Sequence, residues 1–234
     1  MDYPLSFNVD VVFCVDISES MTPHLDRVGQ MIVEFAPTLI LGFTEREKIV
    51  SDIRARIITF GRHTDTETSF GSCPFHTLFS AGGRTNVNLP VSNLVLSEHS
   101  GTTLNNGLAA LSAAINSDWT QTGDRLRHII VVFTDSSAQQ LESRVDFGPG
   151  ARASSMSFSL KSLTDDWQGG DQHGESGGKL RSTARRLLLF APDVEPWTTI
   201  GDNWSSTIFL PSAAGDGLSE SDYASIVKSN VFAV

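Results

Sequence analysis

The sequence predicts an α/β fold in which a doubly wound, mostly parallel central sheet carries helices on both faces. Short apolar runs rich in β-branched residues, typical of buried strands, alternate with segments whose apolar residues recur at helical spacing. Several of the strands end abruptly in polar residues, which is where an open α/β sheet holds its ligands. The 234 residues, 40% of them hydrophobic, are enough for one such domain.

The first predicted strand is the apolar run Val11–Val15, and Asp16-Ile17-Ser18-Glu19-Ser20 follows it at once. A carboxylate and two hydroxyls therefore alternate at positions 16, 18 and 20. Hard divalent cations prefer oxygen ligands of this kind. The alternative is a polar turn in which Ser and Asp only cap backbone groups, and this stretch alone does not decide between the two.

A helix is expected to start at Thr22-Pro23, because Thr can cap a helix and Pro is tolerated at its first position. Pro37 should end or kink that helix. The first half of the chain then continues with four expected elements, which are a short surface helix within Thr44–Asp52, strands at Arg54–Phe60 and near Thr66–Phe70, and a helix from Ser100 to about Ser117.

The second half shows the same alternation, with a closing helix that Ser219 and Asp222 are expected to cap. Its expected elements are strands at Arg127–Phe133, Arg185–Ala191 and Ser206–Leu210, short helices near 158–167 and 197–204, and the closing helix Glu220–Asn230. The segments at about 62–100 and 143–182 are irregular and poor in helical or strand patterns. They are expected to be insertions in a single domain that spans residues 1–234.

The composition narrows the class of partner. A formal net charge of −10 argues against nucleic-acid phosphates, whose binding depends on Lys and Arg. Cys14 and Cys73 do not suggest a disulfide framework. The first residues lack the features of a signal peptide, and no apolar run approaches the ~20 residues that cross a bilayer. We therefore expect a cytoplasmic protein that binds neither nucleic acid nor membrane.

Three strand-to-helix junctions carry oxygen-bearing side chains that could converge at one edge of the sheet. They contain Asp16, Ser18 and Ser20 in the first, Thr102 in the second and Asp135 in the third. Here the sequence resembles the von Willebrand factor A (vWA) family, whose metal-ion-dependent adhesion site (MIDAS) is written D-x-S-x-S, then T, then D.

The match to this motif is specific in each of its three parts. Asp16 to Ser20 matches D-x-S-x-S, and the stretch SGTTLNNGL at 100–108 is similar to the family pattern G-T-x-Φ-x-x-G-L (Φ apolar), which identifies Thr102 as the ligand. Phe133-Thr134-Asp135 resembles the T-D that ends a family strand. The family usually has Gly after this aspartate, where the present chain has Ser136, and Gly permits a positive φ that Ser resists.

The resemblance implies a Rossmann-like vWA fold and a metal site of five residues. Ser18, Ser20 and Thr102 would contact the cation through their hydroxyls, and Asp16 and Asp135 would act directly or through water. Mg²⁺ is the implied ion, with Mn²⁺ or Ca²⁺ as alternatives. The cation would keep one position open for an Asp or Glu of a partner protein.

The predicted function is accordingly a non-enzymatic, Mg²⁺-dependent protein-interaction module. The chain resembles stand-alone bacterial vWA proteins of the tellurite-resistance type, which implies a kinase, phosphatase or AAA+ ATPase partner in a stress or defence complex. One alternative is a phosphotransfer enzyme of a haloacid-dehalogenase-like kind, which would need a second Asp where Ser18 stands. Another is a vWA scaffold whose metal site is unoccupied.

Other candidate sites are weaker. The six histidines are dispersed without the spacing of a zinc site, and no G-x-S-x-G or P-loop motif is present. Trp197 and Trp204 are expected to cover the sheet, although an exposed binding patch is an alternative. Arg181, Arg185 and Arg186 are expected to form a solvated strand end.

Overall fold

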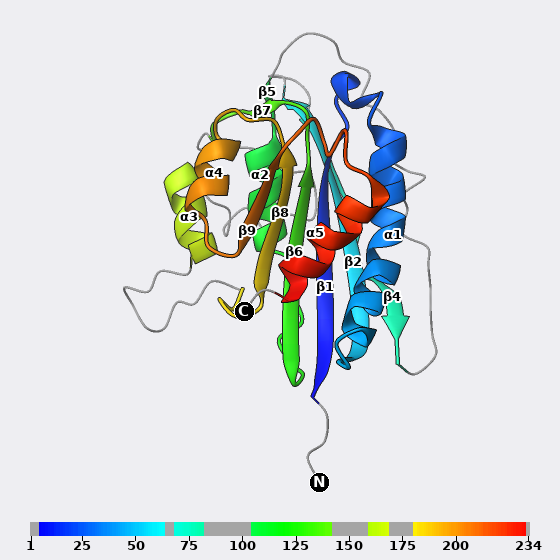
Figure 1. Ribbon diagram of the computed structural model, residues 1–234. Coiled ribbons are helices and arrows are strands. Elements are labelled where there is room, and N and C mark those ends of the chain that lie inside the picture. The colour runs from blue at the N-terminus through cyan, green and yellow to red at the C-terminus, as the bar shows by residue number, and fades with distance from the viewer. Residues whose placement is uncertain (1–4, 64–67, 82–103, 142–158, 169–179, 233–234) are drawn as a thin grey trace.

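The computed structural model describes residues 5–63, 68–81, 104–141, 159–168 and 180–232 (Figure 1). A central sheet of seven strands has the order β3-β2-β1-β6-β8-β9, and β4 also pairs with β2. Its strands are β1 (Ser6–Asp16), β2 (Ile49–His63), β3 (Thr68–Ser72), β4 (His76–Ser80), β6 (Arg125–Phe133), β8 (Arg185–Ala191) and β9 (Thr207–Pro211). A small parallel pair is formed by β5 (Leu104–Asn105) and β7 (Ser137–Ala138).

The sheet is mostly parallel, as the sequence predicts. Strand β1 pairs in parallel with β2 and β6, and the same direction continues through β8 to β9. Strands β3 and β4 run antiparallel along the outer edge of β2. The carboxyl ends of the parallel strands therefore lie at one end of the sheet, where β5 and β7 also lie (Figure 1).

Helices cover both faces of this sheet (Figure 1). They are α1 (Leu25–Thr44) and α5 (Glu220–Phe232) on one face, and α2 (Gly107–Ile115), α3 (Leu160–Gln168) and α4 (Trp197–Asn203) on the other. Successive side chains of a strand point to opposite faces, so Phe13 packs with α1 and α5 while Cys14 packs with the other three helices. Each face thus has its own buried apolar layer, and the predicted fold class is confirmed.

Pro37 is expected to end or kink the first helix, and the first of these two expectations is wrong. Helix α1 begins at Leu25, after a single 3₁₀ turn at Glu19–Met21, and continues through Pro37 to Thr44. Pro37 is exposed, and so is Val33, whose carbonyl loses its helical partner. Water can hydrate that carbonyl, so the apolar face on the other side keeps the helix continuous.

Three further elements differ from the predicted ones. The expected surface helix at 44–52 does not exist, because α1 ends at Thr44 and β2 starts at Ile49. Strand β4 lies in a segment expected to be irregular. Helix α2 begins at Gly107 and not near 102, because residues 104–105 pair with β7. The remaining predicted elements of the second half are found with small shifts, and Ser219 and Asp222 do form the expected reciprocal cap.

The tryptophans and arginines near the carboxyl-terminal strands are buried. Trp197 and Trp204 are 0% and 4% exposed, so they cover the sheet as expected. Of the three arginines expected at a solvated strand end, Arg181 is exposed, but the expectation is wrong for Arg185 and Arg186, which are only 5% and 3% exposed. Arg185 donates to the Ser205 hydroxyl, and Arg186 donates to the Arg185 carbonyl. Each of these guanidinium groups therefore has an oxygen acceptor inside the protein.

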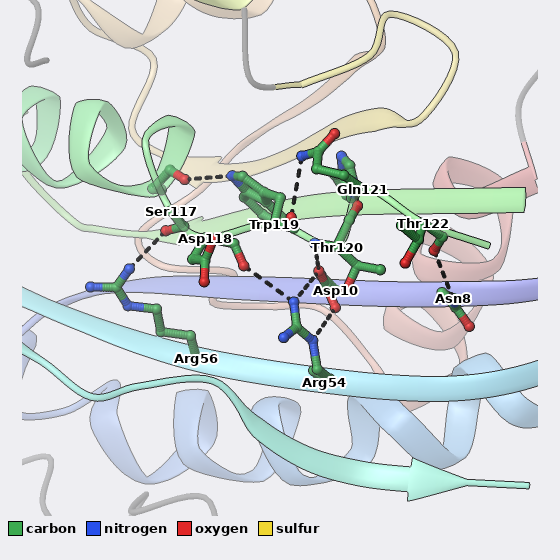
Figure 2. Close-up of polar contacts among 12 residues, drawn as sticks. Asn8, Asp10, Arg54, Arg56, Ser117, Asp118, Trp119, Thr120, Gln121 and Thr122 are labelled. Atoms are coloured by element: carbon green, nitrogen blue, oxygen red, sulfur yellow. Dashed lines mark hydrogen bonds and ion pairs between the residues drawn. The ribbon is translucent and has the colours of Figure 1, made fainter.

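A polar network holds the α2–β6 connection at the opposite end of the sheet (Figure 2). The Asp10 carboxylate, 1% exposed, accepts two hydrogen bonds of 2.8 and 2.7 Å from Arg54 and one of 2.6 Å from the Thr120 amide. Arg54 also donates to the Asp118 carbonyl, and His128 contacts the Thr120 carbonyl. The network anchors residues 117–122 against β1 and β2.

Candidate functional site

The first predicted site loop folds back on itself directly after β1. Asp16 is the last residue of that strand and is 0% exposed. Its Oδ1 accepts a 2.9 Å hydrogen bond from the Ser18 amide, and the Met21 amide bonds to the Ser18 carbonyl at 3.0 Å. This turn brings the Ser18 and Ser20 hydroxyls within 3.1 Å of each other. The spacing D-x-S-x-S thus places its three polar side chains together.

The third predicted loop meets the first one. Asp135 lies two residues beyond the end of β6, and its Oδ1 accepts a 3.0 Å hydrogen bond from the Ser20 hydroxyl. Asp16, Ser18, Ser20 and Asp135 are therefore connected by hydrogen bonds from one end of the set to the other. Thr102 lies outside the described residues, so the structure brings together four of the five predicted ligands.

Ser136 fits the loop in the place where the family usually has Gly. Among the described residues other than glycine, those with a positive φ are Glu47, Ser206 and Ala214, and Ser136 is not one of them. Its hydroxyl donates a 2.7 Å hydrogen bond to Asp135 Oδ1. The loop therefore does not require glycine here, and the serine adds a second donor to the aspartate.

Sequence reasoning missed two residues that contact Asp16. Asn105, 2% exposed, donates through its Nδ2 to Asp16 Oδ2 and, at 2.9 Å, to the Thr134 hydroxyl. The Thr134 hydroxyl in turn donates to Asp16 Oδ2 at 2.7 Å. Thr134 could have been noticed because it is the T of the T-D pair. Nothing in the sequence distinguishes Asn105 from an ordinary turn residue.

The electrostatics of the site favour a bound positive charge. Burial raises the pKa of the Asp16 carboxyl, the neighbouring Asp135 carboxylate adds to this effect, and hydrogen bonds from Ser18 and Thr134 oppose it. Among the described residues, no Lys, Arg or His forms an ion pair with either aspartate. A cation would compensate for the cost of keeping Asp16 buried and charged.

The donor set is made of oxygen atoms. Carboxylates and hydroxyls fit a hard cation such as Mg²⁺ or Ca²⁺ and do not fit a soft one. In the described part of the chain, no three His, Cys, Asp or Glu side chains gather as a zinc-type cluster would. The residues present therefore fit the kind of ion that the sequence predicts.

Comparison with known proteins decides the family. The model of the von Willebrand factor type A domain matches residues 10–156, which is more than half of the chain. The chain belongs to the vWA family. In general terms, membership of this family supports a protein-interaction or adhesion module.

Two solved structures are similar to this vWA chain, each at 11% identity. Proximal thread matrix protein 1 from the mussel byssus gives a TM-score of 0.46 over 97% of this chain and 48% of that protein. The pilus adhesin SpaC from Lactobacillus rhamnosus GG, in its open conformation, gives 0.48 over 96% and 30%. The chain thus spans less than half the length of either protein. A search of curated proteins found no match.

None of the described helices is both long and apolar enough to cross a membrane.

Proposed function

We propose that this vWA chain is a protein-interaction module that holds a divalent cation, Mg²⁺ in the first place, and binds an acidic side chain of a partner through it. Asp16, Ser18, Ser20 and Asp135 would hold the ion. The observation that carries the proposal is the continuous series of hydrogen bonds that joins these four residues, from Asp16 through the Ser18 amide and the two serine hydroxyls to Asp135, at one end of the sheet.

The same set explains why a carboxylate is the favoured ligand. When bound, the ion supplies a positive charge with an open coordination position, to which Asp or Glu is attracted. The three hydroxyls expected in the set add no negative charge. Only the two aspartates therefore offset the positive charge of the ion. Thr102 completes the proposed set on the strength of its motif, as a residue outside the described part of the chain.

Two hydroxyls near the site argue against a catalytic role. A serine nucleophile requires a base within hydrogen-bond reach. The Ser136 hydroxyl donates to Asp135, a proposed metal ligand, and the Ser137 hydroxyl donates to the Glu195 carbonyl. The phosphotransfer alternative also lacks its second aspartate, because Ser18 stands there. We therefore propose a binding function without catalysis.

The biological setting is a more distant part of the proposal. By analogy with bacterial vWA proteins of the tellurite-resistance type, the partner would be a kinase, a phosphatase or an AAA+ ATPase in a cytoplasmic stress or defence complex. The analogy rests on the sequence motifs, and partner capture is the way to examine it.

Calorimetric titration with Mg²⁺ and thermal unfolding with and without EDTA test the proposal. We expect saturable binding and a higher Tm at saturating Mg²⁺, because a ligand that binds only the folded state stabilises it. Asp16→Ala and Asp135→Asn should abolish both effects, and Asp202→Asn, at an exposed aspartate of α4, should change neither. A Tm that does not respond to Mg²⁺ would favour the scaffold alternative.

Partner capture supplies the functional readout. Proteins retained from a native lysate by the wild-type chain in Mg²⁺ should be released by EDTA and should not bind to the Asp16→Ala chain. Retention that is unchanged by both treatments would contradict the proposal. Hydrolysis of an aryl phosphate that Asp16→Asn abolishes would favour the enzyme alternative.

A further inference from the structure

The two oxygens of the Asp16 carboxylate have different surroundings. Oδ2 accepts hydrogen bonds from the Asn105 amide and, at 2.7 Å, from the Thr134 hydroxyl. Among the described residues, Oδ1 accepts one backbone hydrogen bond, from the Ser18 amide at 2.9 Å. A carboxylate oxygen can accept about two hydrogen bonds, so the donors of the described residues fill Oδ2 and leave accepting capacity on Oδ1. The free capacity is on the oxygen that bonds to the loop carrying Ser18 and Ser20.

Asn105 uses all of its side-chain groups in this arrangement. Its two amide hydrogens go to Asp16 Oδ2 and to the Thr134 hydroxyl, and its Oδ1 accepts the Gly107 amide at 3.0 Å. Its backbone carbonyl accepts the Gln139 amide at 2.7 Å. Asn105 therefore joins Asp16 of the first loop, the start of α2 and the loop after β6.

This network allows only one orientation of the Asn105 amide. If the side chain were flipped, its oxygen would face the Asp16 carboxylate and its nitrogen would face the Gly107 amide. Both contacts would then join two groups of the same kind, two acceptors in one case and two donors in the other. Because Asn105 is 2% exposed, water cannot readily replace the lost bonds.

We infer that Asn105 is a positioning residue of the cation site, which holds Asp16 Oδ2 inward and leaves Oδ1 as the oxygen that serves the ion. The inference rests on the proposed function and adds a residue that the MIDAS motif does not contain. Outer residues that orient a metal ligand affect affinity by 10–100-fold when they are replaced.

A simpler role for Asn105 would be to support the first turn of α2 through its Oδ1. That role needs only an acceptor, which an aspartate also supplies. Donation to Asp16 needs the amide hydrogens, which an aspartate lacks. Asn105→Asp therefore separates the two roles, since it keeps the acceptor for Gly107 and places a carboxylate oxygen against Asp16.

The test measures the Mg²⁺ Kd of Asn105→Asp by calorimetry, together with the Tm in EDTA. We expect binding at least about 10-fold weaker than wild type at neutral pH. Asn106→Asp is the charge-matched control, because the Asn106 Nδ2 has no hydrogen-bond partner in the described part of the chain and its replacement removes no contact with Asp16. It should bind Mg²⁺ at least as tightly as wild type.

The direction of the change makes the test decisive. If Asn105 only supports the first turn of α2 or only affects the charge near the site, the added carboxylate would leave the Mg²⁺ affinity unchanged or increase it. Either result overturns the inference. If Asn105→Asp does not fold, Thr134→Val takes its place, since it removes the other donor to Oδ2 and should also weaken binding. Affinity equal to wild type in a folded Thr134→Val chain would likewise overturn the inference.

A spectroscopic readout separates positioning from stability. Terbium(III) can replace the ion, and its luminescence lifetimes in H₂O and D₂O count the water molecules that it binds. If Asp16 is no longer held in place, water should take its position on the ion. The folded Asn105→Asp chain should therefore show more water molecules bound to terbium than wild type. An unchanged number would contradict the inference. If the wild-type chain itself binds no Mg²⁺ or terbium, the proposed function has failed, which is a different result from failure of Asn105 alone.

Discussion

The indole nitrogen of Trp197 donates a 2.8 Å hydrogen bond to the carbonyl oxygen of Ser136, so helix α4 supports the loop that carries Asp135. The Trp197 ring also lies under the start of α2, where a Cβ added at Gly107 would come within 2.7 Å of two ring carbons. Only glycine leaves room for this ring. Trp197 is 0% exposed, so it has little space to move away.

Gly107→Ala should therefore destabilise the protein despite the higher helix propensity of alanine. The expected loss in the free energy of unfolding is about 1–3 kcal/mol, which is typical of overpacking. Urea unfolding measures it. Ala113→Ser adds one atom at a half-buried position of the same helix and should cost much less. Equal stability of Gly107→Ala and wild type would mean that Trp197 does not pack against α2 as described.

The ion pair between Asp10 and Arg54 should contribute strongly to stability, because its carboxylate is buried (Figure 2). Arg54→Ala would leave that carboxylate without its ion-pair partner, and the Thr120 amide would be its one remaining donor among the described residues. We expect a loss of at least about 2 kcal/mol in urea unfolding. Lys161→Ala breaks an exposed pair with Asp165 and should cost less than about 0.5 kcal/mol.

The two aspartate-centred networks differ in how far the sequence could predict them. Asp16, Ser18, Ser20 and Asp135 were predicted because their spacing is a motif and strand ends converge at one edge of the sheet. Asp10 and Arg54 stand inside two strands, and their contact depends on the register of β1 with β2. Register is set by the whole sheet and cannot be derived from either strand alone.

The fold itself was predictable wherever one apolar pattern dominates. The runs at 127–133 and 185–191 are buried strands because most of their residues are apolar. Sequence reasoning failed where distant contacts decide, as for Leu104–Asn105, whose strand conformation comes from pairing with β7. It also failed at Arg185, because the Ser205 hydroxyl that accepts its hydrogen bond lies 20 residues further along the chain.

His128 should make the folded state sensitive to acid. It is 0% exposed, its Nε2 contacts the Thr120 carbonyl at 2.8 Å, and its Nδ1 has no hydrogen-bond partner among the described residues. Burial lowers the pKa of His128 below its ordinary value of 6.5. The unfolded chain therefore binds the proton first, and stability should fall as the pH drops below about 6.5, by up to about 1.4 kcal/mol per pH unit.

Urea unfolding between pH 7.5 and 5 measures this dependence. His128→Gln cannot titrate and keeps a donor, so its stability should fall less steeply over the same range. His24→Gln, at a half-exposed histidine, controls for the loss of a histidine outside the core. Parallel pH profiles of wild type and His128→Gln would contradict the assignment.

Cys14 should report on the opening of helix α2. The thiol is 0% exposed and lies 3.7 Å from the Ala110 carbonyl of α2, to which it donates, and burial raises the pKa of Cys14 to about 12. Thiolate is the reactive form, so a disulfide reagent should modify Cys14 only when the chain opens. Cys73 is half-buried and should react faster, and the Cys73→Ala variant isolates the slow reaction.

Saturating Mg²⁺ should slow the Cys14 reaction in the Cys73→Ala chain. If the ion binds only the folded state, it lowers the population of the opened state by the factor 1 + [Mg²⁺]/Kd. The slowing should disappear in EDTA and in a chain that also carries Asp16→Ala. A Cys14 reaction rate that Mg²⁺ does not change, although calorimetry detects Mg²⁺ binding, would mean that α2 opens independently of the site. That result would conflict with the contact between Asn105 and Asp16.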